Sequence, residues 1–246
     1  MGTLKTEIYG LCKDTTAEFP GWEFSAGKFK NSSLNHTELI VDPGLSFDRG
    51  FAHLQPNIAL NNKRAIKLSK KLLGEAIPTA TVSFQVIAHL LTAMPEPIRL
   101  SCLVCDDKAQ YMATVRQSNR FSEKVLEDLD ERSIDLKNAP TVLAAMLRDG
   151  ISFIERYYQL VNEESLLGNL PAKYTTRNEI PYDEMERQKG VMMCLVHILL
   201  GDFDFVNHYR SEDFKTVFPK RMGELDKIVV ALPDLKRRYA ETGLVI

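Results

Sequence analysis

The prevailing period of the hydrophobic pattern in this chain changes close to residue 118. Before that point, short runs alternate apolar with polar residues between Gly, Pro, Asn and Asp, which is typical of strands joined by turns. After it, apolar residues recur every three or four positions, which indicates amphipathic helices. The change predicts an α+β protein, with a mainly antiparallel sheet in residues 1–117 and a helical bundle in residues 118–246 packed on it. The two parts are expected to form either two subdomains or one compact domain.

In the first part, residues 3–18 have apolar side chains at helical spacing and precede Pro20-Gly21, so the sheet is expected to follow an opening helix. The segments from Trp22 to Leu60 predict three antiparallel strands, with a turn at Asp42-Pro43-Gly44. Further strands are predicted at Val82–Val86, Ile98–Val104 and Tyr111–Val115. The middle one of these is almost continuously apolar, so we expect it to be buried.

A basic helix is predicted between these strands, beginning at the cap Asn61-Asn62 and ending at Gly74. Five basic residues share it with the apolar ones: Lys63, Arg64, Lys67, Lys70 and Lys71. This basic face is interpreted either as an ordinary solvated helix surface or as an anion site. No glycine-rich phosphate loop accompanies it.

The second part contains three longer helical patterns. Pro140 suits the first turn of a helix whose apolar stripe runs on to Val161. Pro181 is expected to open the next helix, which is apolar on most sides up to Gly201 and is therefore predicted to be central in the bundle. The last amphipathic run begins near Met222 and is expected to end at Pro233.

Composition narrows the classes of function. The 246 residues have a formal net charge of -2, which provides no overall attraction to nucleic acid or to an anionic membrane, so neither is expected as a direct partner. The amino terminus lacks the apolar core of a signal peptide, and no stretch has the roughly 20 apolar residues that span a bilayer. A cytoplasmic location is therefore expected.

No self-sufficient catalytic motif occurs in the sequence, so no catalytic residue, cofactor or metal site is predicted. Cys102 and Cys105 have the spacing of redox and zinc sites, but they fall inside a predicted buried strand and are interpreted as apolar thiols. His197 lies in an apolar run and is interpreted as a hydrogen-bonded core histidine. The alternative is a hydrolytic or metal-dependent enzyme with a dispersed site, for which the best set is Asp42, Asp48, His53 and Asp106.

Two acidic groups in the helical part are the candidate partner-binding residues. Carboxylates on a surface can meet a basic partner and accelerate association by electrostatic steering, and aromatic side chains anchor interfaces. The alternative interpretation is that these residues are solvated helix ends or, for the aromatic ones, core. The partner-binding set is Glu123, Glu127, Asp128, Asp130, Glu131, Asp202, Phe203 and Asp204.

Several short motifs in the same order resemble a known group of proteins. They are Gly21-Trp22-Glu23-Phe24, Leu54-Gln55-Pro56-Asn57-Ile58, Phe153-Ile154-Glu155-Arg156-Tyr157, Ser165-Leu166-Leu167 and Val196-His197-Ile198-Leu199-Leu200-Gly201-Asp202-Phe203. This series is similar to that of uncharacterised bacterial proteins found beside secreted polymorphic toxins, a group that includes predicted immunity proteins.

The resemblance implies a cytoplasmic antitoxin in bacterial competition, which binds one cognate protein toxin and blocks its active site or substrate path. It supplies no catalytic residues. The first hypothesis is therefore an immunity protein that acts by stoichiometric occlusion in a heteromeric complex. The alternatives are the dispersed Asp/His enzyme and a non-catalytic scaffold protein, and the oligomeric state stays open.

Overall fold

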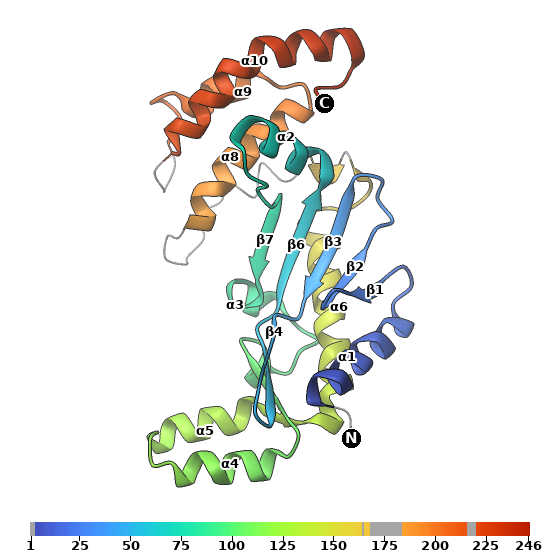
Figure 1. The fold of residues 1–246 in the computed structure, drawn as a ribbon, viewed down its shortest axis with the longest axis vertical. Helices are drawn as coiled ribbons and strands as arrows, with labels where there is room; N and C mark the ends of the chain where they lie inside the picture. Colours follow the sequence, from blue (N-terminus) through green and yellow to red (C-terminus); the bar gives the residue numbers. More distant parts are fainter. Residues whose placement is uncertain (1–2, 164, 168–183, 216–219) are drawn as a thin grey trace. The chain divides into compact units, whose positions relative to one another are not determined.

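The computed structural model describes residues 3–163, 165–167, 184–215 and 220–246. It has the predicted α+β fold, with an N-terminal helix, mainly antiparallel sheets and helices in the second half of the chain (Figure 1). The chain divides into two compact units built from separate segments. Unit 1 comprises residues 1–33, 39–59 and 82–154, and unit 2 comprises residues 34–38, 60–81 and 155–246. The sequence prediction placed a single boundary after residue 117, which here lies between two helices of unit 1.

The first sheet has five strands and is preceded by the predicted opening helix. Its order is β1 (Glu23–Ser25), β2 (Lys28–Asn31), β3 (Thr37–Asp42), β6 (Asn57–Asn62) and β7 (Ala80–Ser83). Helix α1 (Leu4–Thr15) contacts β1, where the Tyr9 ring meets the Phe24 ring edge-on with 5.4 Å between centroids. Phe24 pairs with the fully buried Phe29 of β2. Burial of these rings attaches α1 to the sheet.

The second sheet has four strands and belongs to unit 1. Its order is β4 (Leu45–Asp48), β5 (Phe51–Leu54), β8 (Cys102–Cys105) and β9 (Ser133–Asp135), and only the β8–β9 pair is parallel. All four residues of β8 are buried, as predicted for this strand.

The segment from Trp22 to Leu60 forms six strands instead of the three predicted. The predicted turn at Asp42-Pro43-Gly44 is present, but β3 and β4 on its two sides enter different sheets. Gly44 has a φ of 58°, and a Cβ there would overlap the carbonyl of Gln55. The close approach of Gln55 therefore favours glycine where the chain changes sheet.

One predicted strand, Tyr111–Val115, is wrong, and another, Val82–Val86, is correct only at Val82 and Ser83, because a capping side chain begins a helix in each place. Tyr111–Val115 lies in α4 (Lys108–Gln117), whose first turn is capped by Asp107 through the N–H of Gln110 at 2.9 Å. Similarly, β7 ends at Ser83, which caps the short α3 (Phe84–Ile87). Short alternating patterns also fit one or two helical turns, so the cap decides between the two structures. Helix α4 contacts β8, β9 and its neighbour α5 (Glu123–Arg132).

Helix α6 (Ala139–Tyr157) begins with Pro140 in its first turn, as predicted. It ends before the end of the predicted stripe, and Val161 is 82% exposed. Asp149, only 5% exposed, accepts hydrogen bonds from the N–H groups of Thr92, Ala93 and Met94 at 3.0, 2.9 and 2.8 Å. This carboxylate ties the 92–94 loop to the helix, because a buried charge requires such compensation.

Unit 2 contains the helical bundle. Its helices include α2 (Lys63–Leu73), α8 (Glu184–Leu199), α9 (Asp204–Arg210) and α10 (Met222–Thr242). Both α8 and α10 contact α2. From Val191 to Leu199, every residue of α8 except His197 is buried, so this helix is central in the bundle, as predicted. The expected helix start at Pro181 lies outside the described residues.

The predicted end of the last helix at Pro233 is wrong, because α10 continues through this residue to Thr242. Proline removes one backbone hydrogen bond from a helix interior. Leu232 and Leu235, on either side of it, are each only 4% exposed. Packing of these leucines compensates for the lost hydrogen bond.

Short 3₁₀ turns connect some of these elements. They lie at Thr16–Glu18, Ala88–Leu90, Glu96–Ile98 and Leu136–Asn138. Among the described residues, no helix is both long and apolar enough to cross a membrane.

Candidate binding sites

Helix α5 carries the first predicted acidic group. Glu123, Glu127, Asp128 and Glu131 are exposed, and Asp130 is half-buried. Asp128 pairs with Arg132 on the same helix, and the Oδ1 of Asp130 lies 2.9 Å from the Nζ of Lys108. These two aspartates therefore have partners within the protein.

The three glutamates of α5 differ from the aspartates. Glu123, Glu127 and Glu131 follow one another at intervals of four residues, which places them in a row along one side of the helix. None has a side-chain hydrogen bond or ion pair with any residue that the structure describes. We call these three residues the glutamate row.

Two apolar residues at the start of α5 are exposed, although Val125 lies two residues from Glu123 and from Glu127 and therefore on the other side of the helix from the glutamate row. Phe121, just before α5, is 48% exposed, and Val125 is 39% exposed. Leu126, in contrast, is 7% exposed and attaches the helix to the core of unit 1. Helical spacing in the sequence groups Phe121 and Val125 with Leu126 in one apolar stripe, and only the structure separates the exposed residues from the buried one.

The second predicted acidic group is in unit 2, from the turn after α8 to the first residue of α9. The Oδ2 of Asp202 lies 2.8 Å from the Nδ1 of His197, and the Oδ1 of Asp204 lies 2.8 Å from the Nζ of Lys236. Phe203 is only 7% exposed, and its ring meets that of Tyr239 edge-on. Phe203 is thus a core residue, and both aspartates have partners.

His197 makes the hydrogen bond that its position in an apolar run predicts. Besides Asp202, it contacts the ring of Phe205, which is stacked on the imidazole with 3.5 Å between centroids. The arrangement fixes the turn after α8.

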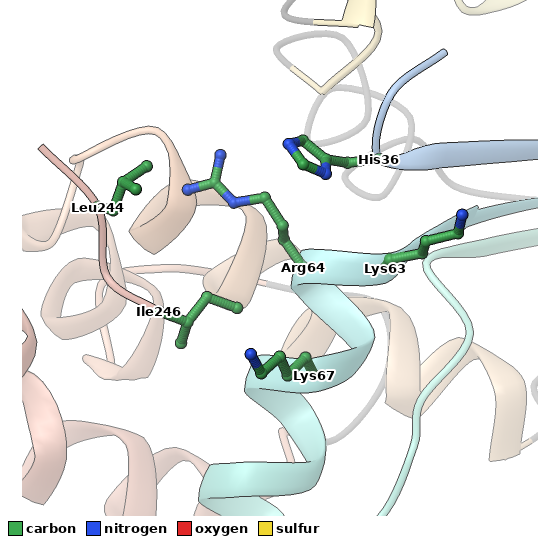
Figure 2. A pocket seen from close by; sticks show the side chains of 6 residues that line it. All are labelled: His36, Lys63, Arg64, Lys67, Leu244 and Ile246. Carbon is green, nitrogen blue, oxygen red and sulfur yellow. The ribbon is translucent and has the colours of Figure 1, made fainter. Parts of the chain in front are cut away.

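A pocket of about 330 Å³ lies at the start of α2 in unit 2 (Figure 2). Its lining consists of four basic or imidazole side chains and two apolar ones: His36, Lys63, Arg64, Lys67, Leu244 and Ile246. Three of these are basic residues that the sequence suggested for an anion site. Sequence reasoning missed His36, Leu244 and Ile246, because they are far from α2 along the chain.

A polar network supports the backbone at this pocket. Asn62, fully buried, caps α2 through the N–H of Ala65 at 2.9 Å and donates to Thr37. The Oε1 of Glu163 accepts from the Thr37 hydroxyl at 2.7 Å and from the N–H of His36 at 3.0 Å. The start of α2 is therefore held to His36 and Thr37 by side chains from three separate segments.

The dispersed Asp/His set is only partly brought together. Asp48 ends β4 and Asp106 follows β8, where the N–H of Asp106 donates to the carbonyl of Gly50 in the β4–β5 turn. His53 lies further along β5, opposite Ser46 and Leu103, while Asp42 ends β3 in the other sheet and pairs with Lys28. Within the described part of the chain, no three His, Cys, Asp or Glu residues are placed to hold a metal ion.

The Cys102 and Cys105 thiols are buried in β8, as predicted. Burial raises the pKa of Cys102 to about 12 and that of Cys105 to about 11. Both are therefore protonated at neutral pH, which makes them poor nucleophiles and metal ligands.

Comparison with protein-family models, with curated proteins and with solved structures finds no match for this chain.

Proposed function

We propose that this protein is a non-catalytic binding protein that neutralises a cognate protein toxin by stoichiometric occlusion in the cytoplasm. The observation that carries the proposal is the glutamate row on α5, whose carboxylates have no partner in the described residues. The resemblance of the short motifs to toxin-associated immunity proteins supports a toxin as the partner.

The charge of α5 determines which partner surface it favours. Helix α5 has five acidic residues against two basic ones, so it favours a positively charged partner surface. Exposed carboxylates increase the association rate more than the final affinity, since solvent screens them. A partner that extends around the start of α5 also contacts the exposed Phe121, and an apolar contact of this kind slows dissociation.

We assign the interface to α5 in preference to the second acidic group. Asp202 and Asp204 already pair with His197 and Lys236, so part of their charge is compensated within the protein. Phe203 would have to leave the core. The glutamate row requires no such rearrangement.

The test uses the full chain and the toxin domain encoded by the neighbouring gene. Association and dissociation rates are measured at low and high salt for the wild type and for a variant with Glu123→Gln, Glu127→Gln and Glu131→Gln. We expect the variant to associate roughly tenfold more slowly at low salt, and the difference to shrink at high salt. Growth of cells that express the toxin provides the functional readout.

A matched control removes three exposed carboxylates elsewhere in unit 1: Glu7→Gln, Asp14→Asn and Glu18→Gln. These changes should leave the association rate within about twofold, because they alter net charge equally but lie outside α5. Equal slowing by both variants would show that only net charge matters. A wild-type chain that neither binds the toxin domain nor rescues growth would refute the immunity function itself.

A further inference from the structure

The pocket at the start of α2 combines a cavity with three basic side chains. Lys63, Arg64 and Lys67 line it, and no acidic side chain of the described residues does. None of the three cations has a side-chain hydrogen bond or ion pair with a residue in the described part of the chain. In Figure 2, Arg64 lies between His36 and Leu244, and Lys67 extends toward Ile246, whereas Lys63 extends away from the two apolar residues.

The position of these cations is unfavourable for the helix itself. The first turn of a helix carries partial positive charge, so carboxylates stabilise it and cations destabilise it. Helix α2 begins with Lys63 and Arg64 and has no acidic residue in its first turn. Helix stability therefore explains Lys70 and Lys71 in the last turn but not the cations at the start.

The pocket is also preorganised. Asn62 and Glu163 hold the start of α2 against His36 and Thr37, so the backbone around the cavity needs little ordering when a ligand binds. The Oε1 of Glu163 accepts from His36, Thr37 and Asn62, so this carboxylate is already engaged in the network.

We propose that this pocket binds a small organic phosphate. A phosphate ester carries up to two negative charges and several acceptor oxygens, which match the guanidinium of Arg64 and the ammonium of Lys67. Leu244 and Ile246 form an apolar wall for the organic group. The volume is at the lower end of small-molecule pockets, so the ligand is small.

Calorimetric titration of the full chain tests the proposal with three probes. Phenyl phosphate has the charge and an apolar group, inorganic phosphate has only the charge, and phenol has only the apolar group. We expect saturable binding of phenyl phosphate at one site, at least about fivefold tighter than inorganic phosphate, and no binding of phenol. No saturable binding of phenyl phosphate at concentrations on the order of 10 mM would overturn the proposal.

Variants on one helix supply the matched control. Arg64→Gln and Lys67→Gln should each weaken phenyl phosphate binding by roughly tenfold or more, because each removes a charge-assisted hydrogen bond. Lys71→Gln, exposed at the other end of α2, should change it less than about twofold. Urea unfolding without ligand verifies that the variants fold, and Arg64→Gln should not lower stability, because it removes an unfavourable charge.

Two results would refute specific binding of an organic phosphate in this pocket. Equal weakening by Lys71→Gln and Arg64→Gln would show that phosphate responds only to the general charge of the helix. Binding of a single-stranded oligonucleotide with steep salt dependence, without saturable phenyl phosphate binding, would show a backbone-binding surface in place of a small-molecule site.

Discussion

Helices α2 and α5 are similar in length, with 11 and ten residues, and both are highly charged, but their ends are stabilised differently. Helix α5 has Glu123 in its first turn and Arg132 in its last, as the helix dipole favours, and its cap residue Ser122 makes no capping hydrogen bond. Helix α2 has cations at both ends and a buried cap at Asn62.

The difference shows which first-turn residues a helix can carry when its cap is held by residues that are distant in the sequence. Because Asn62 is held by Thr37 and Glu163, the start of α2 does not depend on favourable charges in its own first turn. Those positions can therefore carry cations that serve binding. In α5, by contrast, Glu123 also serves the helix itself, so only Glu127 and Glu131 have no explanation in helix stability.

The largest expected effect comes from removing the buried cap. Asn62→Ala removes the acceptor of the Ala65 N–H and the donor to the Thr37 hydroxyl, and it opens a small cavity. It should therefore lower the free energy of unfolding by about 2–4 kcal/mol. Ser122→Ala is the control in α5 and should cost less than about 0.5 kcal/mol. Urea unfolding measures both. An equal decrease in the free energy of unfolding for both variants would contradict the conclusion that the Asn62 cap stabilises its helix more than the Ser122 cap.

Removing the charge that supports this cap should have a smaller effect. Glu163→Gln keeps one acceptor oxygen but weakens the charge-assisted bonds from His36 and Thr37, which should cost about 1–2 kcal/mol. Glu155→Gln, at an exposed position of α6, is expected to stay within about 0.5 kcal/mol of wild type. If both variants unfold at the same urea concentration, the network contributes nothing to the stability of unit 2.

Charge reversal at the first residue of α2 and at the first residue of α5 should change the free energy of unfolding in opposite directions. Lys63→Glu should raise the free energy of unfolding by about 0.3–1 kcal/mol, and Glu123→Lys should lower it by a similar amount. Salt should reduce both effects. Thermal unfolding at low and high salt tests this, and a destabilised Lys63→Glu would indicate that Lys63 has a structural role.

The smallest effect is a pH dependence linked to Arg132, the last-turn cation of α5. Burial, and next Arg132, lower the pKa of His53 below its usual 6.5. The unfolded chain therefore takes up this proton first, so stability should decline as pH falls below about 6.5 and level off below the folded pKa. His53→Gln should flatten this slope in urea titrations from about pH 7 to about pH 5. An unchanged slope in His53→Gln would contradict the prediction.

Local side-chain chemistry made several elements predictable. The cap at Asn62 and the stop at Gly74, which has a φ of 82°, define α2 as expected. Pro140 is in the first turn of α6. The acidic character of α5 was also evident from the sequence, but the exposure of Phe121 and Val125 was not, because helical spacing does not indicate which side of a stripe faces the core.

The wrong predictions share a physical cause. Alternation over five residues at Tyr111–Val115 fits a strand, but Asp107 caps a helix there and its packing on β8 stabilises it. At Pro233 the expected helix stop was overridden by burial of the neighbouring leucines. In both places the environment outside the segment determined its structure.

By itself, the sequence determined the α+β class, the buried β8 strand and the ends of α2, since these depend on side chains close to the backbone groups they stabilise. Only the tertiary structure decided that Glu163 bonds to Thr37 and Asn62, and that His36 joins the cations of α2 around one pocket. Glu163 is separated from Thr37 by 126 residues and from Asn62 by 101. No local pattern specifies such contacts, because they form only when the whole of unit 2 has folded.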